Sequence, residues 1–227
     1  MIYRIRDVVV ALVAISILSP LFAFVGIALL LTGEGEVFYK QPRVGKDRKV
    51  FKIYKFATML KDSPNMGAGT LTMRNDPRVL PFGKILRKTK VNELPQLLNI
   101  LFGNMSLVGP RPLVPSGDSL YSEEEARVIR SVVPGLTGLG SLMLRDEEKY
   151  YGYREDAVAF YEDVIAPYKA SLELWYVRNK TFLLDTKIIF ATALSIFFPR
   201  FEMGYFFPLA PEFPEGLQNE VEYNADQ

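Results

Sequence analysis

The 227-residue chain contains no cysteine and no histidine. Without cysteine it forms no disulfide and performs no thiolate chemistry, which fits a reducing compartment without requiring one. Without histidine, general-base chemistry must fall to carboxylates, and a metal ion would be held mostly by oxygen, which favours magnesium over zinc. The formal net charge is only +1, so composition gives no electrostatic case for binding nucleic acid.

One long apolar segment dominates the N-terminal part. It runs from Val8 to Leu31 without a charged residue, and it is long enough to cross a bilayer of ~30 Å. The simple interpretation is one spanning helix. The residues alone leave that interpretation slightly ahead, but a hairpin that enters and leaves by one face is suggested by Ser19-Pro20 in the middle, where proline kinks or breaks a helix, and by basic residues at both ends. These are Arg4 and Arg6 before the run and Lys40, Arg43, Lys46, Arg48 and Lys49 after it. A cleaved signal peptide is disfavoured because the run is too long and no small-residue cleavage pattern follows it.

The segment 81–112 combines charge with an amphipathic pattern. Basic residues precede the single carboxylate Glu93, and apolar residues then recur at helical spacing. The basic residues are Lys84, Arg87, Lys88 and Lys90, and the apolar ones are Leu94, Leu97, Leu98 and Leu101. Further on, Gly109, Pro110 and Pro112 surround Arg111. Glycine and proline at this spacing predict a rigid turn that fixes the direction of the arginine.

A carboxylate flanked by arginines is common at sites that grip and cleave diphosphates. Arginine binds phosphate oxygens bidentately, and a carboxylate can hold a divalent cation. Arg87, Asn92, Glu93 and Arg111 are therefore candidates for a phosphate-handling site. Spacing alone also allows an ordinary salt-bridge cluster on the surface of an amphipathic helix, which is the more frequent role of such charges.

This segment resembles the signature of the bacterial sugar transferases known as monotopic phosphoglycosyl transferases, whose usual pattern is close to LRK(T/S)…DELPQL.N…GDMS.VGPRP. Other landmarks similar to those of the family follow in order over about residues 4 to 192. They are Arg4 with Asp7, Ser19-Pro20, FYKQPRVG at 38–45, FKIYKFATM at 51–59, NDPR at 75–78, PGLTGL at 134–139 and LDTK at 184–187. Their order and spacing argue against chance similarity.

The resemblance implies an enzyme that moves a sugar 1-phosphate from a nucleoside diphosphate sugar, commonly a UDP-sugar, onto a polyprenyl phosphate. This step starts a lipid-linked glycan, as in exopolysaccharide or lipopolysaccharide biosynthesis. It implies that Arg87 grips phosphate and that Glu93 binds Mg²⁺ or acts as the nucleophile. Substrate contacts are implied for Gly109, Pro110, Arg111 and Pro112. Lys55 could face phosphate, although a solvated strand residue is an equally ordinary role for it.

Asn92 departs from the family pattern. The family uses an Asp-Glu dyad in which the Asp attacks the sugar-bearing phosphate, whereas this chain has Asn92-Glu93. An amide lacks the charge that makes a carboxylate a nucleophile. Three explanations are open: Glu93 takes over as nucleophile, transfer is direct while Asn92 only orients phosphate, or the chain is inactive. Since the surrounding framework is retained, we favour a working transferase.

Local patterns predict several other elements. A short strand is expected around Val50 to Tyr54, a helix near Phe82, and a capped helix over 122–130. Residues 62–72 indicate a mobile loop, and Asp76 and Arg78 are expected to pair with each other or to cap the following helix. The apolar run 188–198 is too short to span a bilayer and fits an interfacial or core helix.

The expected fold is mixed, helix-rich α+β. We expect a re-entrant helix-break-helix over 1–36, a catalytic domain over 37–200 with interfacial amphipathic helices, and an aromatic membrane-contacting segment with a disordered acidic tail over 201–227. The expected location is the cytoplasmic face of the bacterial inner membrane, in contact with lipid. Nothing in the sequence fixes the oligomeric state, and a homodimer is compatible with it. The alternatives are a catalytically silent membrane scaffold that binds nucleotide sugar, and an anchored protein unrelated to sugars.

Overall fold

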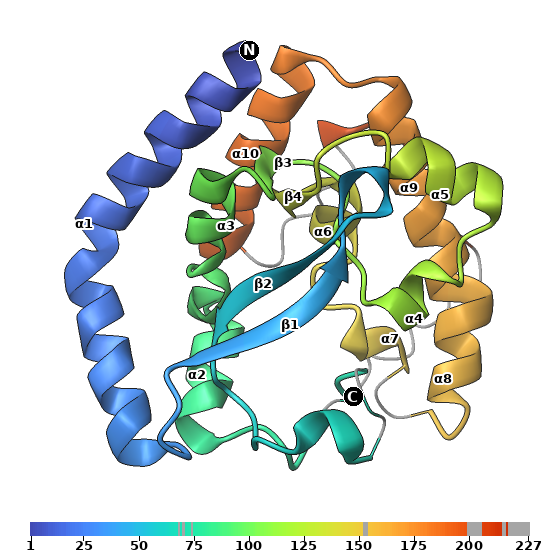
Figure 1. Ribbon diagram of the computed structural model, residues 1–227. Helices are drawn as coiled ribbons and strands as arrows, with labels where there is room; N and C mark the ends of the chain where they lie inside the picture. Colours follow the sequence, from blue (N-terminus) through green and yellow to red (C-terminus); the bar gives the residue numbers. More distant parts are fainter. Residues whose placement is uncertain are drawn as a thin grey trace.

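The computed structural model describes residues 1–67, 69, 71–73, 75–151, 154–198, 206–214 and 217. Helices and short strands are mixed along the chain (Figure 1). The helices are α1 Ile2–Thr32, α2 Pro81–Lys88, α3 Gln96–Phe102, α4 Pro115–Asp118, α5 Glu123–Ile129, α6 Leu139–Met143, α7 Glu148–Tyr151, α8 Ala157–Phe160, α9 Ala166–Arg178 and α10 Phe182–Phe197. The strands are β1 Phe38–Val44, β2 Val50–Phe56, β3 Ser106–Val108 and β4 Gly135–Thr137. This confirms the mixed, helix-rich fold class.

Strands β1 and β2 form an antiparallel hairpin in which Phe38 lies opposite Phe56. The strand predicted around residues 50–54 is therefore confirmed as β2. Helix α3 is fixed to this hairpin through Asn99, which is completely buried. The Asn99 amide accepts the Tyr54 N–H at 3.0 Å and donates to the Lys52 carbonyl oxygen at 2.8 Å. One side chain thus satisfies two backbone groups of β2 and sets the position of α3.

Strands β3 and β4 form a short parallel pair inside the main hydrophobic core. The core is completed by side chains from α3, α6, α9 and α10, among them the fully buried Ile100, Leu139, Leu172 and Ile188. These four helices surround the parallel pair. The loop that leaves β3 therefore starts from a rigid base, and that loop carries the residues 109–112.

Helix α1 continues through Pro20 without the break expected at Ser19-Pro20. Proline has no N–H to give to the carbonyl oxygen of Ser16, four residues earlier. The Ser19 hydroxyl donates to that same oxygen at 2.9 Å, so the acceptor is satisfied locally. Figure 1 shows α1 as one curved helix along the side of the molecule. The re-entrant hairpin is not confirmed.

Both ends of α1 pack against the rest of the protein. Near its start, Arg4 donates to the carbonyl oxygens of Ile100 and Leu101 at the end of α3. Near its end, Val25 and Leu29 are buried in a cluster with Phe56 of β2 and Leu86 of α2. One folded body therefore holds the helix at two places far apart along its length.

A buried polar network reinforces the first of these attachments. Arg6 bonds Asp7 at 2.9 Å and Asp185 of α10 at 2.9 Å. Asp185 also accepts the Tyr176 hydroxyl at 2.8 Å, and Asp7 accepts the Ser106 hydroxyl at 2.5 Å. The Asp7 and LDTK landmarks therefore meet here, in contacts that join α1 to α9, α10 and β3.

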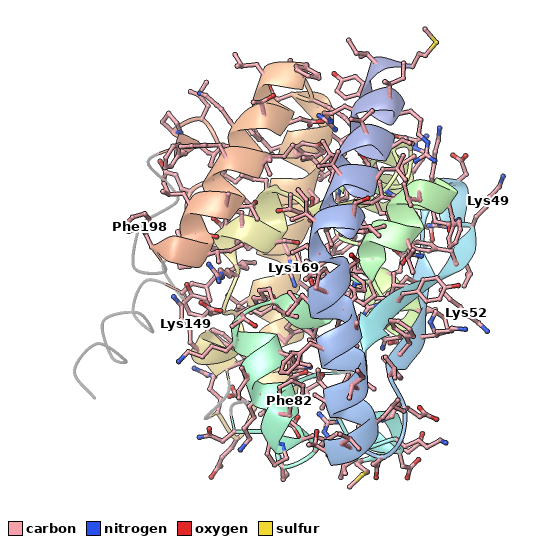
Figure 2. All side chains as sticks on the ribbon, turned by 90° about the vertical axis from the view of Figure 1, so that its left-hand side faces the viewer. Lys49, Lys52, Phe82, Lys149, Lys169 and Phe198 are labelled. Carbon is pink, nitrogen blue, oxygen red and sulfur yellow. The ribbon has the colours of Figure 1, made fainter. Side chains whose placement is uncertain are left out.

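The outer faces of α1 and α10 are apolar and exposed. Figure 2 shows the two helices on the same side of the molecule, and the Tyr3 and Phe182 rings lie 6.0 Å apart at their centroids. Exposed apolar residues include Val9, Val13, Ile17, Phe24 and Ile27 on α1 and Leu183, Phe190 and Ile196 on α10. We call these residues the apolar face. Helix α1 is long and apolar enough to cross a membrane, by length and composition.

The loop expected to be mobile, 62–72, is organised around Arg78. The Arg78 guanidinium donates to the carbonyl oxygens of Ser63, Met66, Gly69 and Leu71, at distances between 2.5 and 2.9 Å. It also pairs with Asp76 at 2.6 Å, which confirms the predicted Asp76–Arg78 pairing. Within its described residues, this loop is tethered at four points.

Two further sequence predictions can be compared with the structure. Helix α5 begins at the predicted cap Ser122, whose side chain forms a capping box with Glu125. In the C-terminal segment, Phe207 is buried, and Phe213 packs on the rings of Tyr150 and Tyr168. These aromatic rings therefore belong to the core and not to an exposed surface. The expected acidic tail lies almost wholly outside the described residues.

Candidate active site

The candidate site is centred on Glu93, at the end of the 3-10 turn Val91–Glu93 between α2 and α3. Lys55 Nζ and Arg111 Nη2 both donate to Glu93 Oε1, each at 2.9 Å. Their side chains are 16% and 30% exposed, and that of Glu93 is 18% exposed. Three residues from separate segments thus meet at one partly covered point. Lys55 is not a freely solvated strand residue.

A third cation, Arg43 of β1, lies close enough to feel the charges of Arg111 and Glu93. Its Nη1 donates to the Pro112 carbonyl oxygen at 3.1 Å, and its Nη2 donates to Gln41 at 2.5 Å. Burial, reinforced by the charge of Arg111, lowers the pKa of Arg43 to about 10. Arg43 was not among the predicted site residues, although it lies in the FYKQPRVG landmark.

The remaining pKa shifts describe a site with more positive than negative charge. Burial lowers the pKa of Lys55 to about 8; the charges of Arg111 and Arg43 act in the same direction, against the attraction of Glu93. Burial alone would raise the pKa of Glu93, but Arg111 and Lys55 outweigh it and hold that pKa well below its usual value. Glu93 is therefore ionised, and it is one carboxylate facing three cations.

Asn92 is buried beside Glu93, at 6% exposure. Its Oδ1 is buried and takes no hydrogen bond from any described residue. An unpaired buried polar atom is costly, and such atoms in folded proteins call for an explanation such as a bound ligand or ion. The position that the resemblance assigns to the nucleophile is thus occupied by an amide whose oxygen takes no hydrogen bond from the described part of the chain.

The turn that carries Arg111 is held along its backbone. Pro110 O accepts the Gly135 N–H at 2.9 Å, Pro112 O accepts from Arg43, and the Arg111 N–H donates to Glu173 of α9 at 3.1 Å. A Cβ on Gly109 would lie only 2.5 Å from a backbone carbonyl oxygen. Gly109 is therefore required for the close approach of this turn to β4.

The structure places Arg87 at the loop 62–72. Its Nη2 donates to the Thr72 hydroxyl at 2.9 Å, and its Nη1 lies 3.6 Å from the Met59 sulfur. These contacts join the end of α2 to the loop that Arg78 organises. The phosphate-gripping role of Arg87 stays a prediction.

The residues present fit a magnesium ion that is shared with substrate phosphates. Lys55 and Arg111 both donate to Oε1 of Glu93. Its other oxygen, Oε2, takes no hydrogen bond from the described residues. No cluster of three or more acidic side chains suited to a metal occurs in the described ranges. Magnesium usually takes one or two carboxylates plus substrate phosphates and water, which one open carboxylate oxygen satisfies.

Comparison with known proteins gives consistent matches. A family model described as bacterial sugar transferase matches residues 1–199. The exopolysaccharide production protein PSS of Rhizobium leguminosarum bv. phaseoli is 37% identical over 199 residues, which are 85% of this chain and 93% of that protein. The undecaprenyl-phosphate glucose phosphotransferase of Komagataeibacter xylinus is 36% identical over 202 residues, 87% of this chain and 36% of that protein. The UDP-glucose:undecaprenyl-phosphate glucose-1-phosphate transferase of Escherichia coli (strain K12) is 34% identical over 197 residues, 86% of this chain and 40% of that protein. The chain thus spans less than half of these two longer transferases.

Proposed function

Since the chain belongs to the bacterial sugar transferase family, we propose that it transfers a sugar 1-phosphate from a UDP-sugar to a polyprenyl phosphate, releasing UMP. The product is the first lipid-linked sugar of a glycan. The relatives named above include an exopolysaccharide production protein and two undecaprenyl-phosphate sugar transferases, which supports this substrate class. The identity of the sugar is not part of the proposal.

The observation that carries the proposal is the excess of positive charge around Glu93. Arg43, Lys55 and Arg111 surround one carboxylate, and each is at least partly buried. Burial, and after it the repulsion among these cations, lowers the pKa of Lys55 and of Arg43. An anionic diphosphate would relieve that repulsion and would accept charge-assisted hydrogen bonds from all three.

The reaction breaks the bond between the sugar-bearing phosphorus and the oxygen that bridges it to the UMP phosphate. That oxygen leaves with the electron pair as part of UMP. A new bond forms between the same phosphorus and an oxygen of the polyprenyl phosphate. Because two anions must approach each other, the main task of the site is to neutralise charge, which arginine and lysine side chains do directly.

Two routes satisfy the geometry of Glu93. In the covalent route, Oε2 attacks the sugar-bearing phosphorus, UMP leaves, and the polyprenyl phosphate then displaces Glu93. In the direct route, the polyprenyl phosphate itself attacks the sugar-bearing phosphorus and displaces UMP in one step, and Glu93 would hold Mg²⁺. A bound Mg²⁺ would add positive charge beside the substrate phosphates. In both routes the Asn92 amide orients a phosphate oxygen or water through hydrogen bonds and forms no covalent bond.

The test measures UMP release from a panel of UDP-sugars, with polyprenyl phosphate and magnesium, for the wild type, Asn92→Asp and Glu93→Gln. We expect the wild type to release UMP and Glu93→Gln to be slower by at least about 10²–10³-fold, the loss seen when one group that stabilises the transition state is removed. Turnover by Asn92→Asp alone would refute a working wild-type enzyme. Intact-mass analysis separates the routes: an added sugar phosphate on Glu93 indicates the covalent one.

We also propose that the protein is monotopic and sits on the cytoplasmic face of the bacterial inner membrane. Support comes from α1, whose two ends pack on the same folded body while its outer face stays apolar. That body carries the charged site. The folded body therefore lies in the water on one side of the membrane, where a soluble nucleotide sugar can meet a lipid phosphate.

A further inference from the structure

Glu173 is a fully buried carboxylate, 1% exposed, that the proposed reaction does not use. Its Oε1 accepts the backbone N–H of Arg111, while its Oε2 is buried and takes no hydrogen bond from the described residues. Burying an acid with one oxygen unpaired is unfavourable. The Arg111 N–H is thus the one hydrogen-bond donor that reaches this carboxylate from the described residues.

The cations near Glu173 are already paired with other acids. Lys169 bonds Glu147 at 2.6 Å, Arg130 pairs with Asp118, and the Arg111 guanidinium pairs with Glu93. Burial raises the pKa of Glu173 to about 7, partly offset by the Arg111 N–H and by the charges of Lys169 and Arg130. The closest stabilising contact of Glu173 is thus the Arg111 backbone.

The backbone around Arg111 explains why this contact matters. Proline has no N–H, so Arg111 supplies the one amide donor between Pro110 and Pro112. The carbonyl oxygens of both prolines are held by Gly135 and Arg43. Glu173 therefore completes the attachment at the residue whose side chain reaches the site.

The PGLTGLG segment leaves room for this carboxylate. A Cβ on Gly140, at the start of α6, would lie 2.8 Å from Glu173 Oε1 and 3.2 Å from its carboxyl carbon. Helices α6 and α9 pack together there, and a Cβ at residue 140 would push the Glu173 carboxylate away from its present place beside the Arg111 N–H. This gives the glycine a physical role that the sequence pattern did not reveal.

We propose that Glu173 is a positioning residue: by accepting the Arg111 N–H, it fixes the direction in which the Arg111 guanidinium meets Glu93 and the substrate phosphates. The inference rests on the proposed function for its kinetic consequence. Its structural part, the hydrogen bond to Arg111, can be measured without substrate. The two parts can therefore fail separately.

The structural test is hydrogen–deuterium exchange of the Arg111 amide, followed residue by residue, since within 110–112 only Arg111 carries a backbone N–H. The variants are Glu173→Ala and Glu173→Gln, with Tyr176→Phe as the control. Tyr176 is buried on the same helix but bonds Asp185 and Val108. We expect Glu173→Ala to speed the exchange of this amide at least tenfold, while Glu173→Gln, which keeps the acceptor, and Tyr176→Phe leave it slow. Unchanged exchange in Glu173→Ala would overturn the proposal.

The kinetic test is a double-mutant cycle on UMP release with Glu173→Ala and Arg111→Ala. If Glu173 acts through Arg111, Glu173→Ala lowers kcat/KM about ten- to a hundredfold in the wild type and has almost no further effect in Arg111→Ala. Full additivity of the two losses would also overturn the proposal. If the wild type turns over no UDP-sugar, the proposed function fails, and the exchange experiment still decides whether Glu173 holds Arg111.

Discussion

Among the cations of the candidate site, Lys55 is the one whose charge changes closest to neutral pH. Its pKa is lowered to about 8, first by burial and then by Arg111 and Arg43. Lysine is charged below its pKa, so the site holds its full positive charge below about pH 8 and loses one charge above it. We therefore expect kcat/KM for the nucleotide sugar to fall as the pH rises above about 8, because this parameter reports the free enzyme.

The matched variant for this prediction is Lys55→Arg, whose guanidinium stays charged throughout this range. The alkaline fall should disappear or move to higher pH in Lys55→Arg, even if the shape of the new side chain lowers the rate overall. The measurement is UMP release between pH 6 and about 10 for both proteins. The same alkaline fall in both would show that another group controls it.

Local patterns in the sequence indicated some of the residues that meet in the candidate site. The spacing of Glu93 and the turn around Arg111 indicated a phosphate site, and the structure brings these two residues together with Lys55. Glu173 could not be predicted, because its contact joins residues 62 positions apart and its own segment reads as an ordinary charged and aromatic helix. Arg43 was visible in a family landmark, but nothing local indicated that it would hold Pro112.

At the scale of an element, the loop 62–72 is held by one guanidinium. Arg78 donates to four of its carbonyl oxygens, and lysine cannot reproduce that fork of donors. We expect Arg78→Lys to lower the free energy of unfolding by roughly 2–3 kcal/mol, because one buried and several partly buried carbonyl oxygens lose their donor. Limited proteolysis should then cut the loop faster than in the wild type.

Arg154→Lys is the control for this change. Arg154 and Asp156 also lie two residues apart and bond at 2.8 Å, but their side chains are 32% and 56% exposed, against 4% and 2% for Arg78 and Asp76. A partly exposed pair contributes little to stability, so Arg154→Lys should change the unfolding midpoint and the cleavage rate much less than Arg78→Lys does. Equal effects of the two substitutions would rule out the tethering role of Arg78.

The sequence predicted some helices and strands correctly and missed other features. The strand β2 and the capped helix α5 follow from local alternation and from Ser122, and both are present. The break at Pro20 was expected from Ser19-Pro20, from the basic flanks and from the family resemblance, and it is absent from α1, where the Ser19 hydroxyl satisfies the Ser16 carbonyl oxygen. The loop 62–72 was expected to be mobile from its composition. Its tether, Arg78, lies outside the loop, so the composition of the loop could not reveal it.

At the scale of the whole molecule, the protein combines the exposed apolar face with a partly buried charged site. Helices α1 and α10 present exposed apolar residues on one side, and such a patch marks a surface for lipid or for another protein. The sequence predicted the apolar run and, over 188–198, an interfacial or core helix, and most of that second segment lies in α10. One of its faces enters the core through Ile188 and Ala191, while Phe190 on another face is also apolar but exposed.

The arrangement of α1 predicts the topology of the protein in the membrane. A helix that spans the bilayer would separate its two ends, yet Arg4 at one end and Leu29 at the other both pack on the same folded body. The chain has no cysteine, so single cysteines at Ile2 and Lys46, both exposed, can be labelled without interference. In oriented membrane vesicles, we expect an impermeant maleimide to reach both positions from the cytoplasmic side and neither from the other side. Labelling of Ile2→Cys from the opposite side to Lys46→Cys would establish a spanning helix and would require α1 to detach from the body that holds it here.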